Sequence, residues 1–188
     1  MQIYRYESAL EEKMILVHVA MPSVREIREQ RKIMVKKDGR MRPNWVDLQM
    51  RWDTGMITAN YIKYLEDVDQ EMEDSVERAC DQVGDRFAHE YRILAESDIT
   101  MIQIENARDV IECAKDFDLE AEERVKSALR RLPERFRPDE VASATGLGQR
   151  AVRAGTALVG KGFTSIPKNV RLDGGTLLFN LVAFDGPR

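Results

Sequence analysis

Two histidines, two cysteines and a run of carboxylates are the side chains of this chain best suited to catalysis or metal binding. His18 and His89 stand among apolar residues, and His89 is not part of an HExxH zinc motif because position 93 is isoleucine. Neither a P-loop nor a dinucleotide-binding glycine motif occurs. The carboxylates between Glu66 and Asp81 share one face of an expected helix, and a solvated surface explains them better than acid–base chemistry. We therefore expect no catalytic residues, no metal site, no cofactor and no enzymatic activity.

Composition narrows the class of protein further. The 188 residues suffice for one or two domains with buried cores, and no run of eighteen apolar residues predicts a membrane span. Cys80 and Cys113 are too few for a disulfide framework or a zinc site. Each stands among apolar residues at helical spacing, so we expect two buried thiols in a reducing compartment and a cytoplasmic protein.

Charge is distributed unevenly along the chain, whose net charge is −4. Residues 1–59 carry +3, residues 60–120 carry −12 and residues 121–188 carry +5. The central segment repels a phosphate backbone, and the C-terminal segment attracts one. A second basic cluster spans Arg25 to Arg42, with Trp45 just beyond it. Three interpretations stay open: a solvated surface, a site that holds a nucleic-acid strand by charge and stacking, or a surface that docks on an acidic helix such as residues 66–81.

The first segment, residues 1–55, is basic and has few clear structural signals. Residues 13–20 fit either a buried strand or a short helix. Ser23 and Glu26 stand at capping-box positions and predict a helix over residues 24–34. The turn sequence Lys37-Asp38-Gly39-Arg40 predicts a hairpin with short strands at 32–36 and 41–48.

The second segment, residues 56–118, is acidic and helical in pattern. Apolar residues recur at three- and four-residue steps from Tyr61 to Leu94, which predicts one long amphipathic helix over residues 56–96. Forty residues of helix extend about 60 Å, longer than a compact domain needs. We expect this helix to join two copies of the chain or to pack on a protein partner. A second amphipathic helix is predicted over residues 98–117.

The third segment, residues 119–188, predicts three helices followed by a β-hairpin. The helices cover residues 119–132, 139–145 and 149–160, with Pro133 ending the first and Gly146 the second. Strands are predicted at 163–166, 170–172 and 176–184, and Asp173-Gly174-Gly175 forms a tight turn before the last of them. The expected fold class is α+β, mainly helical.

Residues from about 122 to 184 resemble a winged helix-turn-helix domain, roughly a third of the chain. They match a pattern of small residue, turn glycine, apolar residue and then a valine in the next helix, and the strands around Asp173 supply the wing. The resemblance is to this domain alone and does not extend to the full length. The residues that carry it are Ala142, Gly146, Leu147, Val152, Leu158 and Gly162-Phe163.

The resemblance implies that the third helix enters the major groove of DNA by its N-terminal residues, which here are Gln149, Arg150 and Arg153. Arginine offers a forked donor to guanine, and glutamine pairs with adenine. The expected function is a non-enzymatic DNA-binding protein, such as a regulator of transcription or replication. The candidates for phosphate contact are Lys161, Lys168 and Arg171.

Two features favour an alternative function. The third helix contains Ala154-Gly155-Thr156, which offers little to a groove, and the wing turn carries Asp173 and no basic residue. In this alternative the chain is a structural subunit of a larger assembly, such as a virus particle, and the winged helix docks on protein. The expected location is then the virion.

Overall fold

The chain folds into two compact units, which we describe separately. The computed structural model describes residues 5–182. The first unit comprises the residues up to His18 and residues 23–100, and the second comprises residues 19–22 and the chain from Met101 onward. About 46% of the described residues are helical and 25% are in strands, so the fold is α+β with helix in excess. Within this range every helix is too short or too polar to span a bilayer.

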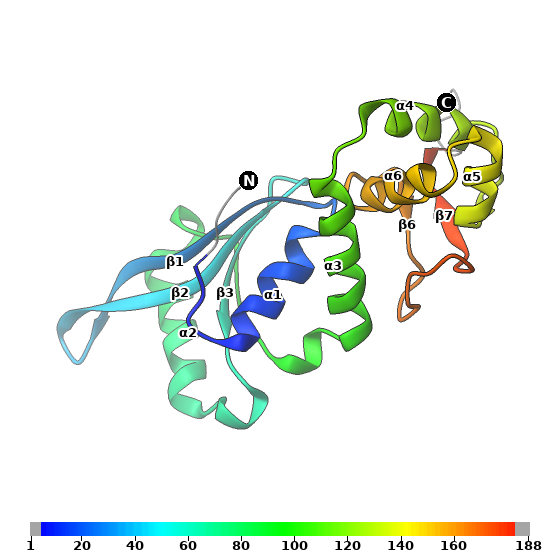
Figure 1. Ribbon diagram of the computed structural model, residues 1–188. Coiled ribbons are helices and arrows are strands. Elements are labelled where there is room, and N and C mark those ends of the chain that lie inside the picture. Colours follow the sequence, from blue (N-terminus) through cyan, green and yellow to red (C-terminus); the bar gives the residue numbers. More distant parts are fainter. Residues whose placement is uncertain (1–4, 183–188) are drawn as a thin grey trace. The chain divides into compact units, whose positions relative to one another are not determined.

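A four-stranded mixed sheet forms the centre of the first unit (Figure 1). Helix α1 (Ala9–Val19) is followed by strands β1 (Val24–Lys37), β2 (Arg40–Trp52) and β3 (Ile57–Ile62), and helix α2 (Gln70–Val83) connects β3 to β4 (Glu90–Leu94). The strand order is β1-β2-β3-β4, with β1, β2 and β3 antiparallel and β3 parallel to β4. A parallel pair requires a crossover connection, which α2 provides. Single 3-10 turns occupy Leu65–Asp67, Gly84–Arg86 and Glu96–Asp98.

One face of this sheet packs on α2. Figure 1 shows α1 in front of the sheet and α2 behind it. Apolar side chains of β1, β2 and β3 form a cluster with α2, and this cluster excludes water from the back of the sheet. Its buried members are Ile33, Val35, Val46, Ala59, Tyr61, Val76, Ala79 and Ala88.

The long helix predicted over residues 56–96 is wrong, because those residues form β3, α2 and β4. Asp69 caps α2 by accepting a hydrogen bond from the Met72 N–H at 2.8 Å, and Gly84, with φ 53°, ends the helix. Strand β3 is buried on both faces, so its sequence is an almost continuous apolar run that spacing alone does not distinguish from a helix. The oligomer contact expected along this helix loses its structural basis.

The predictions for the N-terminal segment are partly confirmed and partly wrong. The helix predicted over residues 24–34 is wrong, since β1 covers them, whereas residues 13–20 are mostly helical in α1. The hairpin around Lys37-Asp38-Gly39-Arg40 is confirmed, with Asp38 at φ 52° and Gly39 at φ 76°, the left-handed pair that a two-residue turn requires. Cys80 is exposed on α2 and Cys113 is partly buried, so the expectation of two buried thiols is wrong for Cys80.

As far as residue 182, the second unit holds four α-helices and a small antiparallel sheet. The helices are α3 (Met101–Lys115), α4 (Leu119–Leu129), α5 (Pro138–Thr145) and α6 (Gln149–Gly160), in agreement with the predicted positions. Strands β5 (Arg135–Phe136), β6 (Thr164–Ser165) and β7 (Leu178–Asn180) form a sheet in the order β5-β7-β6. Helix α6 packs against α3, α4 and α5. The core includes Val125, Leu129, Phe136, Val141, Leu158 and Leu178.

The strand predicted at residues 170–172 does not form. The side-chain amide of Asn106 donates to the Val170 carbonyl at 2.8 Å and accepts from the Leu172 N–H at 2.8 Å, so these backbone groups bond to α3 and not to a strand. The turn at Asp173 is present, with the carboxylate accepting from the Gly175 N–H at 2.8 Å. The predicted return strand is shorter than expected, and its last positions, 183 and 184, lie outside the described residues.

Candidate functional site

The residues predicted to enter a DNA groove lie together at the start of α6. Gly146 (φ 69°) ends α5 and Gly148 (φ 53°) precedes α6, so two positive-φ glycines turn the chain between the two helices. Gln149, Arg150 and Arg153 are exposed on the first turns of α6. The three predicted residues therefore share the N-terminal end of α6, which is basic and accessible to solvent.

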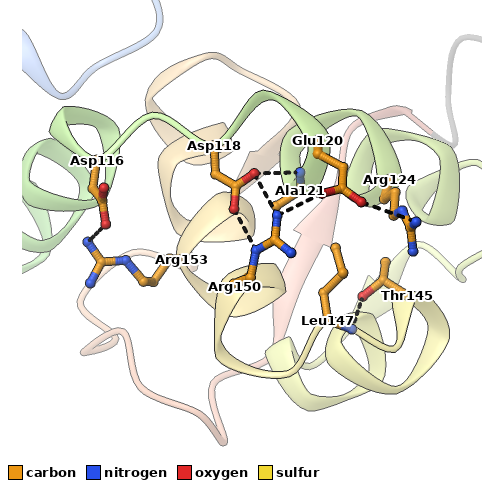
Figure 2. Close-up of polar contacts among 9 residues, drawn as sticks. All are labelled: Asp116, Asp118, Glu120, Ala121, Arg124, Thr145, Leu147, Arg150 and Arg153. Carbon is orange, nitrogen blue, oxygen red and sulfur yellow. Dashed lines mark hydrogen bonds and ion pairs between the residues drawn. The ribbon is translucent and has the colours of Figure 1, made fainter.

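Arg150 is paired with two carboxylates from the start of α4 (Figure 2). Its Nε and Nη2 donate to Asp118 at 2.7 and 3.0 Å, and Nη2 also donates to Glu120 at 2.9 Å. The Arg150 hydrogen bond, followed by that from the Ala121 N–H, lowers the pKa of Asp118 to about 2. The same carboxylates raise the pKa of Arg150, with Asp118 making the larger contribution. Both groups are fully charged at neutral pH.

Three further predicted DNA contacts are also paired with carboxylates. Arg153 contacts Asp116 at 2.7 Å, and Lys161 contacts Glu122 at 2.6 Å. Arg171 contacts Glu105 at 3.1 Å and Asp109 at 2.5 Å. Lys168 is exposed and has no ion pair with any residue between 5 and 182. The positive charge predicted for this surface is thus largely neutralised within the unit.

Packing explains the small residues in the middle of α6. Ala154, Gly155 and Thr156 are buried, because α3, α4 and α5 surround this part of the helix. At Gly160 a Cβ atom would lie 2.9 Å from Val110 Cγ1 of α3, so a side chain there would require Val110 or the backbone to shift. The exposed side chains of α6 are those of Gln149, Arg150 and Arg153, on its first turns.

A pair of carboxylates that the sequence analysis did not single out lies in the first unit. Glu11, on α1, is 7% exposed, and Asp47, on β2, is partly buried. The side chain of Gln30 links them, since its Nε2 donates to Glu11 Oε2 at 3.3 Å and the same side chain hydrogen-bonds Asp47. The only signal in the sequence was one acidic residue between Val46 and Leu48 in a predicted strand.

An irregularity in the sheet positions this acidic pair. Glu29 pairs with Leu48 and Arg31 with Val46, so Gln30 and Asp47 lie opposite each other outside the ladder. Gln30 has φ 50°, a conformation that L-residues rarely adopt and that marks local strain. Asp47 Oδ2 accepts a hydrogen bond from the Ile62 N–H at 2.7 Å, beyond the last β2–β3 ladder pair. Lys63 follows directly.

The electrostatics of Asp47 favour a proton or a cation at this place. Burial raises the pKa of Asp47 to about 6, and the negative charge of Glu11 acts in the same direction. The Ile62 and Gln30 hydrogen bonds and the charge of Lys63 oppose the shift. No group of three or more His, Cys, Asp or Glu side chains within residues 5–182 is placed to hold a metal ion. A cation at the pair would therefore take its other ligands from solvent or substrate, as Mg²⁺ often does.

Both histidines bond to the backbone. His18 Nδ1 lies 2.7 Å from the Met14 carbonyl oxygen, and burial lowers the pKa of this imidazole. His89 Nδ1 accepts from the Ile57 N–H at 2.9 Å, next to the start of β3. These contacts assign both side chains to local structure.

A scan against protein-family models finds no match for this chain, and a search among curated proteins finds none either.

Replacing Asp47 with asparagine is expected to stabilise the metal-free protein by about 2 kcal/mol at pH 7. Because the folded pKa is raised from 3.8 to about 6, the folded state binds more protons than the unfolded state between these values, and wild-type stability falls as pH rises through them. Asparagine still accepts from the Ile62 N–H and carries no charge. Urea unfolding from pH 4 to pH 7 in EDTA measures the effect. If the free energies of unfolding of wild type and variant change with pH in parallel, the raised pKa does not belong to Asp47.

Proposed function

We propose that this protein binds duplex DNA through its C-terminal unit, and that residues 119–182 form a winged helix-turn-helix. The observation that carries the proposal is the order α4–β5–α5–α6–β6–β7 together with the strand order β5-β7-β6. The three helices and the antiparallel hairpin follow one another along the chain in the order that the resemblance implies. The chain between β6 and β7 is then the wing, and α6 is the helix directed at DNA.

Arg150 and Arg153 bind phosphate in this proposal by exchanging their carboxylate partners. Their side chains are 50% and 52% exposed, so both ion pairs lie in water, where such pairs contribute little to stability. A guanidinium group offers the same forked donors to a phosphate as to a carboxylate. The neighbouring carboxylates weaken binding without preventing it, so we expect a modest affinity for random sequences.

Replacing Arg150 and Arg153 together with alanine is expected to weaken binding to a random 20-base-pair duplex about tenfold at 50 mM salt. Loss of two phosphate contacts also reduces the salt slope by up to about 1.8, which fluorescence anisotropy at several NaCl concentrations measures. The matched control is Arg51→Ala with Arg92→Ala, which removes two ion-paired cations of the first unit. Absence of wild-type binding at 50 mM salt would refute the proposal and favour the alternative, an assembly subunit that docks on protein.

The Glu11–Asp47 pair favours a second candidate function, magnesium-dependent cleavage of a phosphodiester. Two partly desolvated carboxylates attract a divalent cation, and Mg²⁺ is commonly held by one or two carboxylates plus the phosphates of a substrate. Lys63 lies near enough to lower the pKa of Asp47 and would stabilise negative charge that develops on the phosphate. This function would replace the expectation that the chain is not an enzyme.

A further inference from the structure

The outer part of the β1–β2 hairpin is a positively charged ribbon. Between residues 31 and 45 it carries six cations and one carboxylate, that of Asp38. Lys37 is paired with Glu71 of α2 at 2.7 Å. The other five have no carboxylate within ion-pair distance in the part of the chain that the structure describes, in contrast to the arginines of α6. These five are Arg31, Lys32, Lys36, Arg40 and Arg42.

One face of the ribbon packs on α2, and the opposite face is open to solvent. Ile33 and Val35 point toward α2, so the alternation of a strand directs their neighbours to the other side. The cross-strand pairs that alternate with them are Lys32 with Trp45, Met34 with Pro43 and Lys36 with Met41. We call these six residues the ribbon face. Met34 and Met41 also border a hollow near the end of α2, beside Gln82 and Val83. The β2–β3 ladder begins only at Leu48, so β3 does not continue beside this part of β2.

The ribbon face combines apolar surface with ammonium groups. Trp45 is 52% exposed, Met34 and Met41 are also exposed, and Lys32 Nζ lies 5.8 Å from the centre of the Trp45 ring. None of the six side chains is an amide or a hydroxyl, the groups that most often read base edges alongside arginine. A flat ring beside lysines instead suits an unpaired base, which stacks on the ring while its phosphates contact the ammonium groups.

We infer that the ribbon face binds single-stranded nucleic acid, with a base stacked on Trp45 and phosphates held by Lys32 and Lys36. The charge complementarity selects a polyanion, and the exposed ring selects an unpaired base over a duplex. Asp47 lies two residues from Trp45 along β2, about 7 Å in an extended strand, so a bound strand passes close to the acidic pair. The inference does not depend on DNA binding by α6.

Fluorescence anisotropy of a labelled 15-nucleotide dT strand, titrated with the full-length protein in EDTA, tests this site. Replacing Lys32 and Lys36 with glutamine is expected to weaken binding about 20-fold at 100 mM salt and to reduce the salt slope by about 1.4. Trp45→Ala weakens it about tenfold, whereas Trp45→Phe keeps most of the affinity. Bound strand also quenches tryptophan emission in wild type and not in Trp45→Phe, which retains Trp52.

Two control variants separate this site from others on the chain. Arg92→Gln with Lys115→Gln removes the same charge from ion-paired positions and should leave strand binding within twofold of wild type. Arg150→Ala with Arg153→Ala tests the duplex-binding proposal separately, and it should weaken strand binding much less than the Lys32/Lys36 variant does. The inference is overturned if the Lys32/Lys36 variant binds the strand as wild type does. It is also overturned if the Lys32/Lys36 and Trp45 variants weaken only the binding of a matched duplex, or only the self-association of the protein.

Discussion

Replacing Glu11 with glutamine, or Asp47 with asparagine, is expected to lower the rate of magnesium-dependent DNA cleavage at least about a thousandfold. Each amide keeps the shape of the carboxyl group and its ability to accept a hydrogen bond, and removes the charge that holds the cation. The measurement is nicking of supercoiled plasmid in 10 mM MgCl₂. Lys63→Gln is expected to slow the reaction while leaving Mg²⁺ binding in place.

Thermal unfolding supplies a readout of the same site that does not depend on cleavage. Mg²⁺ that binds only the folded protein raises the melting temperature, and the rise should be absent from both carboxylate variants. The matched control is Asp81→Asn, which removes an exposed carboxylate from α2 and should respond to Mg²⁺ as wild type does. If Mg²⁺ neither stabilises wild type nor supports nicking, the acidic pair has a structural role only.

Replacing Lys161 with methionine is expected to lower the free energy of unfolding by about 3 kcal/mol. Replacing a solvent-exposed lysine whose role is to contact DNA phosphate would change the free energy of unfolding much less. The Lys161 Nζ lies 2.6 and 2.7 Å from the two carboxylate oxygens of Glu122, whose side chain is 4% exposed. Removing the ammonium group leaves a buried carboxylate without its ionic partner. Urea unfolding at pH 7 measures the loss.

A double variant distinguishes this explanation from a simple loss of packing. Glu122→Met combined with Lys161→Met removes both charges, so most of the lost stability should return. Equal destabilisation in the single and double variants would show that the ion pair is not the cause. A strong effect of Lys161→Met on DNA binding with unchanged stability would restore Lys161 to the phosphate-contacting set implied by the resemblance.

Local signals predicted the helices of the second unit well. Caps, prolines and glycines mark helix ends within a few residues, which is why α3, α4, α5 and α6 lie close to their predicted positions. The turn at Asp38-Gly39 located the hairpin for the same reason. Strands β3 and β4 were missed, because a parallel pair is stabilised by contacts between segments far apart in sequence and because β3, which is buried, lacks alternation.

The sequence by itself determined where the cations lie along the chain, which segments are helical in the second unit, and where the hairpin turns. Only the tertiary structure determines which cations are paired with a carboxylate. Arg150 pairs with Asp118, 32 residues away, whereas most cations of the ribbon have no carboxylate within ion-pair distance among residues 5–182. The tertiary structure also brought Glu11, Gln30 and Asp47 together from three elements. The physical reason is that electrostatic interactions depend on distance in space, and separation along the chain does not fix that distance.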